Sequence, residues 1–174
     1  TALVVYNVTE DEDTGLSSGY FYWDGGLWRK MQIELPSTTV SNRTLVSHVS
    51  SIADDGTGTV GALLNFNPIV VPVDGVFMFY FRLYGFLYGT SYPAQCTFYL
   101  SVWADDVLMD IVEISGNFFG SGITYSASLV SPAKAGQNIT FKFSHIAGAG
   151  YYWQLRSHTS LTDPVRTSLI WWQL

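Results

Sequence analysis

The sequence is poor in charge, in cysteine and in basic clusters. Charged residues make up 13% of its 174 residues, and 8 Lys and Arg stand against 14 Asp and Glu, a formal net charge of −6 at pH 7. Since no run of basic residues is present to neutralise phosphates, the sequence argues against nucleic acid as a partner. The single cysteine, Cys96, excludes an internal disulfide framework and a multi-cysteine metal cluster. Stability must therefore come from an apolar core and from assembly.

Long apolar runs are also absent. The most apolar stretch, residues 69–88, is interrupted by a proline, an aspartate, an arginine and two glycines. It therefore lacks the roughly 20 uninterrupted apolar residues of a membrane-spanning helix. The chain begins at Thr1, without an initiator methionine and without the basic and apolar regions of a signal peptide. We expect no membrane span, and either a processed product or an ordered piece of a longer protein.

What the sequence does have is aromatic residues, 16% of the total, gathered largely in short alternating runs. Gly, Asp, Asn and Pro bound these runs, as is typical of strands. No segment of twelve or more residues combines apolar residues at helical spacing with a cap. The sequence thus predicts an all-β fold, a two-sheet antiparallel jelly-roll sandwich with a short N-terminal β-hairpin. The strands of the sandwich are expected at residues 61–66, 75–84, 96–103, 107–114, 123–130, 138–145, 150–156 and 167–173, with a hairpin turn at Asp105-Asp106.

The first 35 residues differ from the rest in charge. They carry six acids against two basic residues, so −4 of the total −6 lies here. Residues 20–23 and 27–31 flank Asp24-Gly25-Gly26, where glycine permits a tight hairpin turn with Trp23 and Trp28 near its tip. An isolated hairpin is marginal in water, so this one must pack on a neighbour. We predict an attachment hairpin over residues 1–35, a Ser/Thr-rich linker and first strand over 36–60, and the sandwich over 61–174.

Four segments of the predicted sandwich resemble a known family in their residues and order. Residues 71–79, VPVDGVFMF, resemble the P-x-D-G-x-Y-x-F entry into a central strand of the C1q and TNF-like trimeric jelly-roll heads. Residues 100–108 resemble the family's L-x-x-N-G-x-x-V hairpin, with Asp-Asp in place of Asn-Gly. Residues 128–139 are similar to its L-x-L-x-x-G-D-x-V motif, with Gln in place of Asp. Residues 168–174 resemble its apolar terminal strand. The resemblance covers about residues 61–174.

A second motif, GYFYWDGGLWRKM at residues 19–31, resembles the G-x-Y-Y-W-D-G-x-x-W element of fibre and surface proteins of Bacteroidota and their phages. Together the two resemblances imply a trimeric structural head of a virion tail fibre, a spike or a bacterial surface appendage. Such a head would lie outside the cell, on a virion or on the bacterial surface. It would serve host attachment, receptor binding or cell adhesion, and residues 1–35 would hold other fibre or particle proteins.

The pattern of the central run 76–84 independently favours assembly. Apolar or aromatic side chains occupy both parities of this run, and only one parity of a strand can face the sandwich core. The other needs cover, which contact between copies around a threefold axis would supply. Cover by the N-terminal hairpin of the same chain is the alternative. The residues expected in the core or the trimer interface are Phe77, Phe79, Tyr80, Phe81, Trp171 and Trp172.

Two functions remain open from the sequence. One is a recognition head that binds a host or partner surface molecule through its loops. The other is a lectin-like carbohydrate-binding module, in which exposed aromatic rings stack on sugar faces beside polar groups. In either case the contacts are expected from aromatic residues interleaved with Gly and Ser: Tyr88, Tyr92, Phe118, Phe119, Tyr151 and Tyr152.

The sequence offers no converging catalytic groups. The three histidines, His48, His145 and His158, lie in or beside polar stretches, and none has a cysteine or second histidine at metal-ligand spacing. Cys96 has no basic neighbour that would activate its thiol, so a buried inert thiol is favoured. No nucleophile elbow, phosphate loop or zinc-helix motif is present, and nothing selects a glycosidase pair among fourteen acids. We expect a non-enzymatic protein without a cofactor.

Calcium is the one ion that the acidic residues raise as an alternative. Asp105 and Asp106 with Asp110, or the run 10–13, could supply oxygen ligands, and an extracellular setting would supply Ca²⁺. Adjacent carboxylates on a strand point to opposite faces, so the Asp-Asp pair would need a loop to converge. Solvated turns are the favoured interpretation, and no metal site is assigned.

Overall fold

The computed structural model describes residues 4–8, 18–30, 40–90, 95–117, 122–158, 160 and 162–174. The chain divides into two compact units, Thr1–Ser37 and Thr38–Leu174. In the described ranges all regular structure is strand, and no helix there is long and apolar enough to cross a membrane. The all-β prediction is confirmed.

The first unit is a three-stranded antiparallel sheet of β1 (Val4–Asn7), β2 (Gly19–Trp23) and β3 (Trp28–Lys30), in that order. The turn between β2 and β3 is built on Asp24, whose Oδ1 accepts the N–H groups of Gly26 and Leu27, both at 2.9 Å. Its Oδ2 accepts a hydrogen bond from Nε of Arg29. The Arg29 guanidinium lowers the pKa of the Asp24 carboxyl to about 2. The predicted hairpin is therefore β2–β3, and β1 adds a strand that was not predicted.

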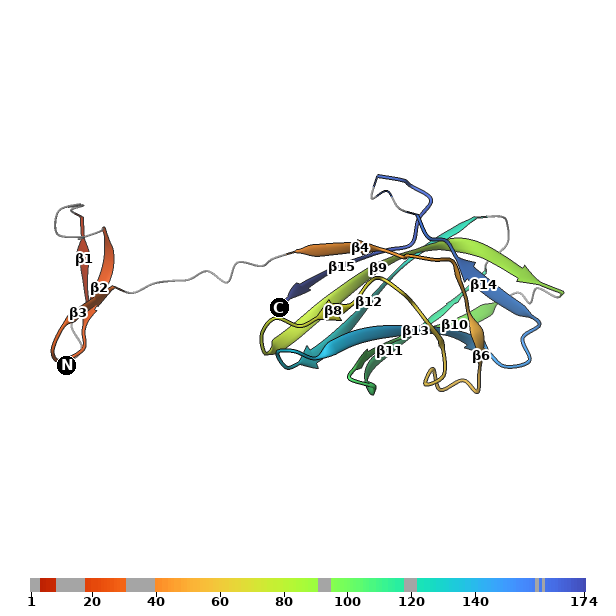
Figure 1. Ribbon diagram of the computed structural model, residues 1–174, viewed down its shortest axis with the longest axis horizontal. Helices are drawn as coiled ribbons and strands as arrows, with labels where there is room; N and C mark the ends of the chain where they lie inside the picture. The colour runs from red at the N-terminus through yellow and green to blue at the C-terminus, as the bar shows by residue number, and fades with distance from the viewer. Residues whose placement is uncertain are drawn as a thin grey trace. The chain divides into compact units, whose positions relative to one another are not determined.

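The second unit is a sandwich of two six-stranded sheets (Figure 1). We call one the β9 sheet and the other the β10 sheet. The β9 sheet contains β4 (Ser41–Thr44), β15 (Ser168–Gln173), β9 (Gly75–Gly89), β14 (Tyr151–Leu155), β5 (Val49–Ser50) and β12 (Ile123–Ala133). The β10 sheet contains β11 (Val107–Gly116), β10 (Cys96–Ala104), β13 (Asn138–Ile146), β6 (Ile52–Asp54), β7 (Ala62–Leu63) and β8 (Ile69–Val70).

The long strand β9 organises the first of these sheets. β12 pairs with residues 75–85 of β9, while β15 pairs with 77–82 and β14 with 85–89. β14 and β15 thus behave as one strand interrupted by residues 156–167. Thr167 closes the interruption, because its N–H donates to the Arg156 carbonyl at 2.8 Å and its hydroxyl donates to the Tyr84 carbonyl at 2.9 Å.

Aromatic rings fill the space between the two sheets. Phe77, Phe79 and Phe81 project inward from β9 and are fully buried. Phe141 of β13 lies at the centre, in edge-on contact with the rings of Phe79 and Phe81 at 5.2 and 5.0 Å between centroids. Trp171 of β15 is buried beside Phe79. This core is complete within one chain. The inward-facing residues of the central run 76–84 are therefore buried without a partner.

The N-terminal part of the sandwich differs from the sequence prediction. A linker and first strand were expected over residues 36–60, yet β4, β5 and β6 lie within 41–54 and pair with β15, β14 and β13. These strands are short and polar, and Leu45 is the one apolar residue of 40–50 that is buried. Their hydrogen bonds to sheet edges, rather than apolar alternation, hold them in place. The sandwich unit accordingly starts at Thr38 rather than at residue 61.

The hairpin turn predicted at Asp105-Asp106 is confirmed. Both residues have positive φ, 44° and 66°, as the two central residues of a tight β10–β11 turn require. Oδ1 of Asp105 accepts the N–H of Asn138 at 2.9 Å, which ties the turn to the start of β13. The predicted strand 61–66 is not continuous, because the structure has only the two-residue strand β7 there and a second short strand, β8, after it.

Candidate functional site

The outward face of β9 carries the residues on which the assembly prediction depends. Alternate residues of the strand point away from the core: Val76, Met78, Tyr80, Arg82, Tyr84, Phe86 and Tyr88. The strand begins beside the C-terminus and ends at the opposite end of the sandwich (Figure 1). Its outward face has two chemically different ends.

The first, the apolar end, consists of Val76, Met78, Tyr80, Ile170, Trp172 and Leu174. Tyr80 pairs with Ile170 and Met78 with Trp172, and the N–H of Leu174 donates to the Val76 carbonyl at 2.8 Å. The side chains of Val76, Tyr80, Ile170 and Leu174 are 39–64% exposed. None of the six residues is charged. An uncharged patch of this kind on a sheet face is typical of an interaction surface.

The second, the Tyr88 cluster, consists of Phe86, Tyr88, Tyr152, Gln154 and Arg156. The rings of Tyr88 and Tyr152 stack at 5.4 Å with an angle of 20° between planes, and they are 37% and 39% exposed. The guanidinium carbon of Arg156 lies 4.7 Å from the centre of the Phe86 ring. Nη2 of Arg156 donates to the Tyr88 hydroxyl at 3.3 Å. Aromatic and cationic groups therefore meet at this end.

Close strand packing positions this cluster. A Cβ on Gly85 would lie 2.1 Å from the Gln154 carbonyl oxygen, so β14 can approach β9 only because Gly85 has no side chain. The register then sets Tyr88 opposite Tyr152 and Phe86 opposite Gln154. Met78 and Tyr88 are ten residues apart, about 33 Å along an extended strand. A partner that covers one end therefore leaves the other open.

The structure divides the predicted interface residues between the two faces of the β9 sheet. Phe77, Phe79, Phe81 and Trp171 are buried in the core of their own chain, whereas Tyr80 and Trp172 lie on the outward face. Of the predicted contact residues, Tyr88 and Tyr152 are exposed side by side. Tyr92, Phe118 and Phe119 lie outside the described residues.

The expectation for Tyr151 is wrong. Its side chain is only 4% exposed, because residue 151 has the inward parity of β14 and its neighbour Tyr152 the outward one. The Tyr151 hydroxyl accepts the N–H of Thr97 at 2.8 Å, and burial raises the pKa of this phenol. Tyr151 therefore serves the core, while Arg156 and Phe86, which the sequence did not single out, complete the surface cluster.

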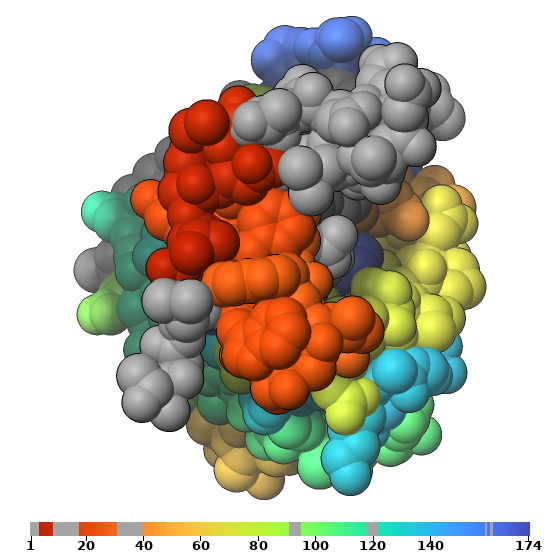
Figure 2. Space-filling model, turned by 90° about the vertical axis from the view of Figure 1, so that its left-hand side faces the viewer, coloured from red at the N-terminus to blue at the C-terminus, as the bar shows by residue number. Residues whose placement is uncertain are grey.

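The sheet of the first unit is aromatic on both faces. One face has Val5, Asn7, Phe21 and Trp28 around a cavity of about 260 Å³, and Trp23 meets Trp28 edge-on at 5.5 Å. The other face has Tyr6 against Tyr20 at 4.8 Å. Figure 2 shows β1 in red and the β2–β3 hairpin in orange, with their side chains at the surface. A single sheet cannot bury both faces, so this unit leaves aromatic and apolar side chains exposed.

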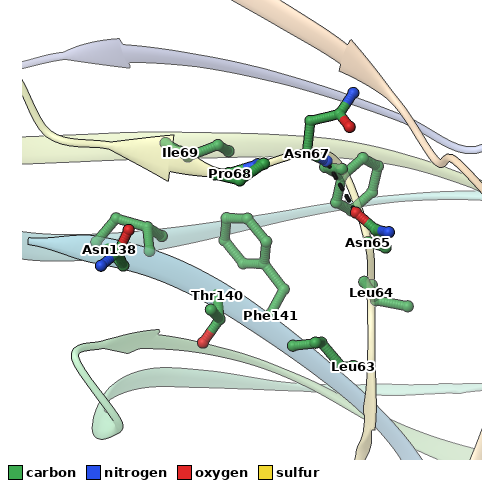
Figure 3. Close-up of a pocket in the computed structure, with 11 residues that line it drawn as sticks. Leu63, Leu64, Asn65, Asn67, Pro68, Ile69, Asn138, Thr140 and Phe141 are labelled. Carbon is green, nitrogen blue, oxygen red and sulfur yellow. Dashed lines mark hydrogen bonds between the residues drawn. The ribbon is translucent and has the colours of Figure 1, made fainter.

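A further cavity, of about 240 Å³, lies between residues 63–69 and β13 (Figure 3). It forms because the chain leaves β13 between β7 and β8. Phe141 points toward this segment, but Thr140 points to the other side of β13 and the Asn67 amide is directed away from it (Figure 3). The cavity therefore has apolar walls without converging polar groups, and we assign it no ligand.

The candidate calcium ligands are occupied by backbone groups. Asp110 accepts the N–H of Ile111 through Oδ1 and that of Val130 through Oδ2, and Asp105 accepts the N–H of Asn138. In the part of the chain that the structure describes, no three or more His, Cys, Asp or Glu side chains gather as a metal site would need. The acidic run 10–13 lies outside the described residues.

Each of the three histidines contacts a side-chain oxygen. His48 contacts the Ser157 hydroxyl at 2.8 Å and His158 contacts Asp163 at 2.8 Å. Burial lowers the pKa of His145, whose Nδ1 lies 2.9 Å from the Ser51 hydroxyl. Cys96 is buried, and this burial raises the pKa of its thiol. Two of these contacts place a serine hydroxyl beside a histidine nitrogen, while the cysteine has a raised pKa, the opposite of an activated thiol.

One buried carboxylate was missed by the sequence analysis. Asp54 accepts three backbone N–H groups at 2.8 Å, those of Gly56, Gly58 and Val60. It thereby folds residues 55–60 into a loop that packs on Tyr99. The Asp-Asp-Gly-Thr-Gly-Thr sequence at 54–59, with two glycines, is the local signal that could have indicated such a turn. The role of Asp54 is structural.

The strand order and the two packed sheets define a β-sandwich of the jelly-roll class, with exposed aromatic and apolar residues on one sheet. The sequence matches no protein-family model and no curated protein. Among solved structures it is similar to the Eiger TNF from S. frugiperda, at 12% identity and a TM-score of 0.46, over 79% of this chain and 92% of that chain. The likeness is weak and concerns the fold alone.

Proposed function

We propose that the protein is a non-enzymatic recognition head that assembles as a homotrimer through the apolar end of the β9 sheet. The observation that carries the proposal is the exposure of Val76, Tyr80, Ile170 and Leu174 on the outward face, opposite a core that one chain completes by itself. Burial of such surface between copies stabilises them by about 25 cal/mol per Å². Closed symmetry would cover the same patch on every copy.

The same proposal places the head on a virion or a bacterial surface, as the C1q/TNF-like and the W-D-G resemblances imply. The first unit supports an attachment role. It has 37 residues, below the roughly 40 at which a chain usually needs added support to fold, and both faces of its sheet are aromatic. Contact with other fibre or particle proteins would supply that support. The proposal includes neither catalysis nor a cofactor.

The mass of the particle in solution tests the proposal. Light scattering on the eluted protein should give about 58 kDa, three times the 19.3 kDa of one chain. Tyr80→Asp places a charge in the middle of the apolar end and should give 19.3 kDa. Val107→Asp, a change of the same kind at an exposed position of the β10 sheet, should leave the trimer intact. A wild-type monomer at micromolar concentration would refute the trimeric head.

A carbohydrate-binding module is the second candidate function, and the Tyr88 cluster favours it. Two half-exposed tyrosines beside an arginine and a glutamine combine ring faces with hydrogen-bonding groups, as sugar-binding surfaces do. The two candidates are compatible, because Tyr80 of the apolar end and Phe86 of the cluster are still about 20 Å apart along the strand. Binding to printed glycans that survives in the Tyr80→Asp monomer would show that recognition is independent of assembly.

A further inference from the structure

The β9 sheet is free of acidic residues along its strands. None of β4, β5, β9, β12, β14 and β15 contains Asp or Glu, although the whole chain has a net charge of −6. In the β10 sheet, by contrast, β6 contains Asp54 and β11 contains Asp110 and Glu113. Among the strands of the sandwich, acidic residues therefore occur on one sheet, and the other five acids of residues 38–174 lie between strands. The outward face of the β9 sheet is correspondingly favourable for a negatively charged group.

Arg156 is the cation of this face nearest to exposed aromatic rings. Its guanidinium packs on Phe86 and donates once, through Nη2, to the Tyr88 hydroxyl. No Asp or Glu oxygen lies within 4.0 Å of its nitrogens in the described residues, and its Nε has no hydrogen-bond partner there. Asp163, in the same interruption of the strand, is engaged by His158 and by the N–H of Val165. Arg156 is thus held in place by Phe86 and Tyr88, with no counter-charge among the described residues. Its Nε is buried, so a ligand would meet the guanidinium at its Nη1 and Nη2 edge.

The neighbouring tyrosines add a surface for a ring. Each ring of the stacked Tyr88–Tyr152 pair has one face against the other and leaves its remaining surface half-exposed. The C–H faces of sugars pack on such rings. Gln154, opposite Phe86 in the register, adds a neutral amide whose Nε2 lies 3.4 Å from the Ser50 hydroxyl.

We propose that the Tyr88 cluster binds a sugar that carries a carboxylate, with Arg156 pairing with the carboxylate and Tyr88 and Tyr152 contacting the sugar ring. A planar guanidinium matches a carboxylate with two parallel hydrogen bonds. One arginine balances one negative charge, which fits a uronic acid better than a doubly charged phosphate. This inference rests on the proposed recognition function and names the chemical class of its ligand.

Matched pairs of sugars test the inference on the full-length protein. An array that prints uronic acids beside the neutral sugars of the same stereochemistry identifies the preferred pair, and calorimetry with the methyl glycosides of that pair then measures the two affinities. The acid should bind at least about tenfold more tightly than its neutral counterpart, as a charge-assisted bidentate contact predicts. Arg156→Gln should remove this preference, and Arg156→Lys should restore only part of it because the fork is lost.

Arg43→Gln provides the matched control. Arg43 lies on β4 of the same sheet and donates to the Asn42 carbonyl, so its removal changes the charge of the sheet equally and should leave the preference unchanged. Thermal unfolding of each variant shows whether it is folded, and Tyr152→Ala should weaken both members of the pair.

Three outcomes would overturn the inference. If neutral sugars bind as tightly as uronic acids and Arg156→Gln has no effect on binding, the cluster binds glycans without recognising the carboxylate. If sulfated sugars bind and carboxylated ones do not, the anion is wrongly assigned. If no sugar binds while the protein is trimeric, the inference fails and the trimeric head stands. In the opposite case, a monomer that binds uronic acids, the trimer would be refuted and the inference about the ligand would stand.

Discussion

The apolar end and the Tyr88 cluster lie on the same face of the same strand and differ in polarity. At the apolar end, Val76, Met78 and Ile170 offer no hydrogen-bonding side chain, so only another apolar surface can cover them well. In the Tyr88 cluster, hydroxyl, amide and guanidinium groups surround the rings, and a polar ligand can satisfy them. The comparison teaches that one outward sheet face can carry two chemically different surfaces when the strand is long enough to separate them.

A negative charge placed at each end in turn should give the largest effects and opposite ones. Met78→Glu puts a carboxylate in the proposed interface, and an unpaired buried charge costs about 3–5 kcal/mol. We expect a monomer that still binds the acidic sugar. Gln154→Glu, a change of similar size in the Tyr88 cluster, should leave the mass at about 58 kDa and abolish binding of the acid by repulsion. Light scattering measures the mass of both variants, and calorimetry measures their binding of the acidic sugar. If the two variants behaved identically, the two surfaces would not be independent.

Thermal unfolding should report the same difference. A trimer becomes more stable as its concentration rises, whereas a monomer does not, since association is linked to folding by mass action. The unfolding midpoint of the wild type should therefore rise with protein concentration, and that of Met78→Glu should not. A concentration-dependent midpoint in Met78→Glu would place the interface elsewhere.

Thr167 closes the interruption between β14 and β15. Removal of its hydroxyl should give the next largest effect on stability. The buried hydroxyl donates to the Tyr84 carbonyl and accepts the Tyr84 N–H at 3.1 Å. Thr167→Val leaves both groups without this partner, which should lower the free energy of unfolding by about 2 kcal/mol. Thr124→Val, at an exposed position opposite Tyr84 on β12, should change it by less than about 0.5 kcal/mol. Urea unfolding at one fixed protein concentration makes the comparison, and equal effects would refute the role of Thr167.

The stacked tyrosines should contribute less than the Thr167 contacts. A double-mutant cycle with Tyr88→Ala, Tyr152→Ala and both together isolates their coupling. Aromatic pairs contribute about 0.5–1.5 kcal/mol beyond their burial, and we expect a coupling in that range from urea unfolding. The mass should stay trimeric in all three variants. Zero coupling would mean that the two rings are held independently by their strands.

Sequence alone predicted that apolar residues occupy both faces of β9, because period-two patterning decides which residues share a face. Phe79 and Tyr80 fall on opposite faces for that reason. The Tyr88 cluster was only half predicted. Tyr151 and Tyr152 are adjacent aromatic residues, and their parity depends on where β14 meets β9 at Gly85. Arg156 reaches Phe86 across 70 residues of sequence, so no local pattern indicates that contact.

The polar edge strands were missed for a related reason. Residues 41–54 have no apolar alternation, and their strand pairing is provided by residues more than 90 positions later. Asp54 is buried because three backbone N–H groups solvate its carboxylate, a set that exists only after the loop has formed. Long-range pairing and backbone solvation of charge are not visible in composition or periodicity, whereas strand alternation is.

Acidification should have the smallest effect on stability, and it should alter neither the apolar end nor the Tyr88 cluster. Burial lowers the pKa of His145 on β13, although its contact with Ser51 opposes the shift. The unfolded chain, in which histidine titrates near pH 6.5, therefore takes up this proton more readily than the folded one. The contribution of His145 to stability is full above about pH 6.5 and is lost as pH falls through the lowered folded value. The free energy of unfolding should decline between pH 7.5 and 5.5, with a shallower slope in His145→Gln. No side chain of the apolar end or of the Tyr88 cluster is a histidine or a carboxylic acid, so the mass measured by light scattering should stay constant over this range. Dissociation on acidification would show that a titrating group lies in the interface, and equal slopes for the wild type and His145→Gln would remove His145 as the cause.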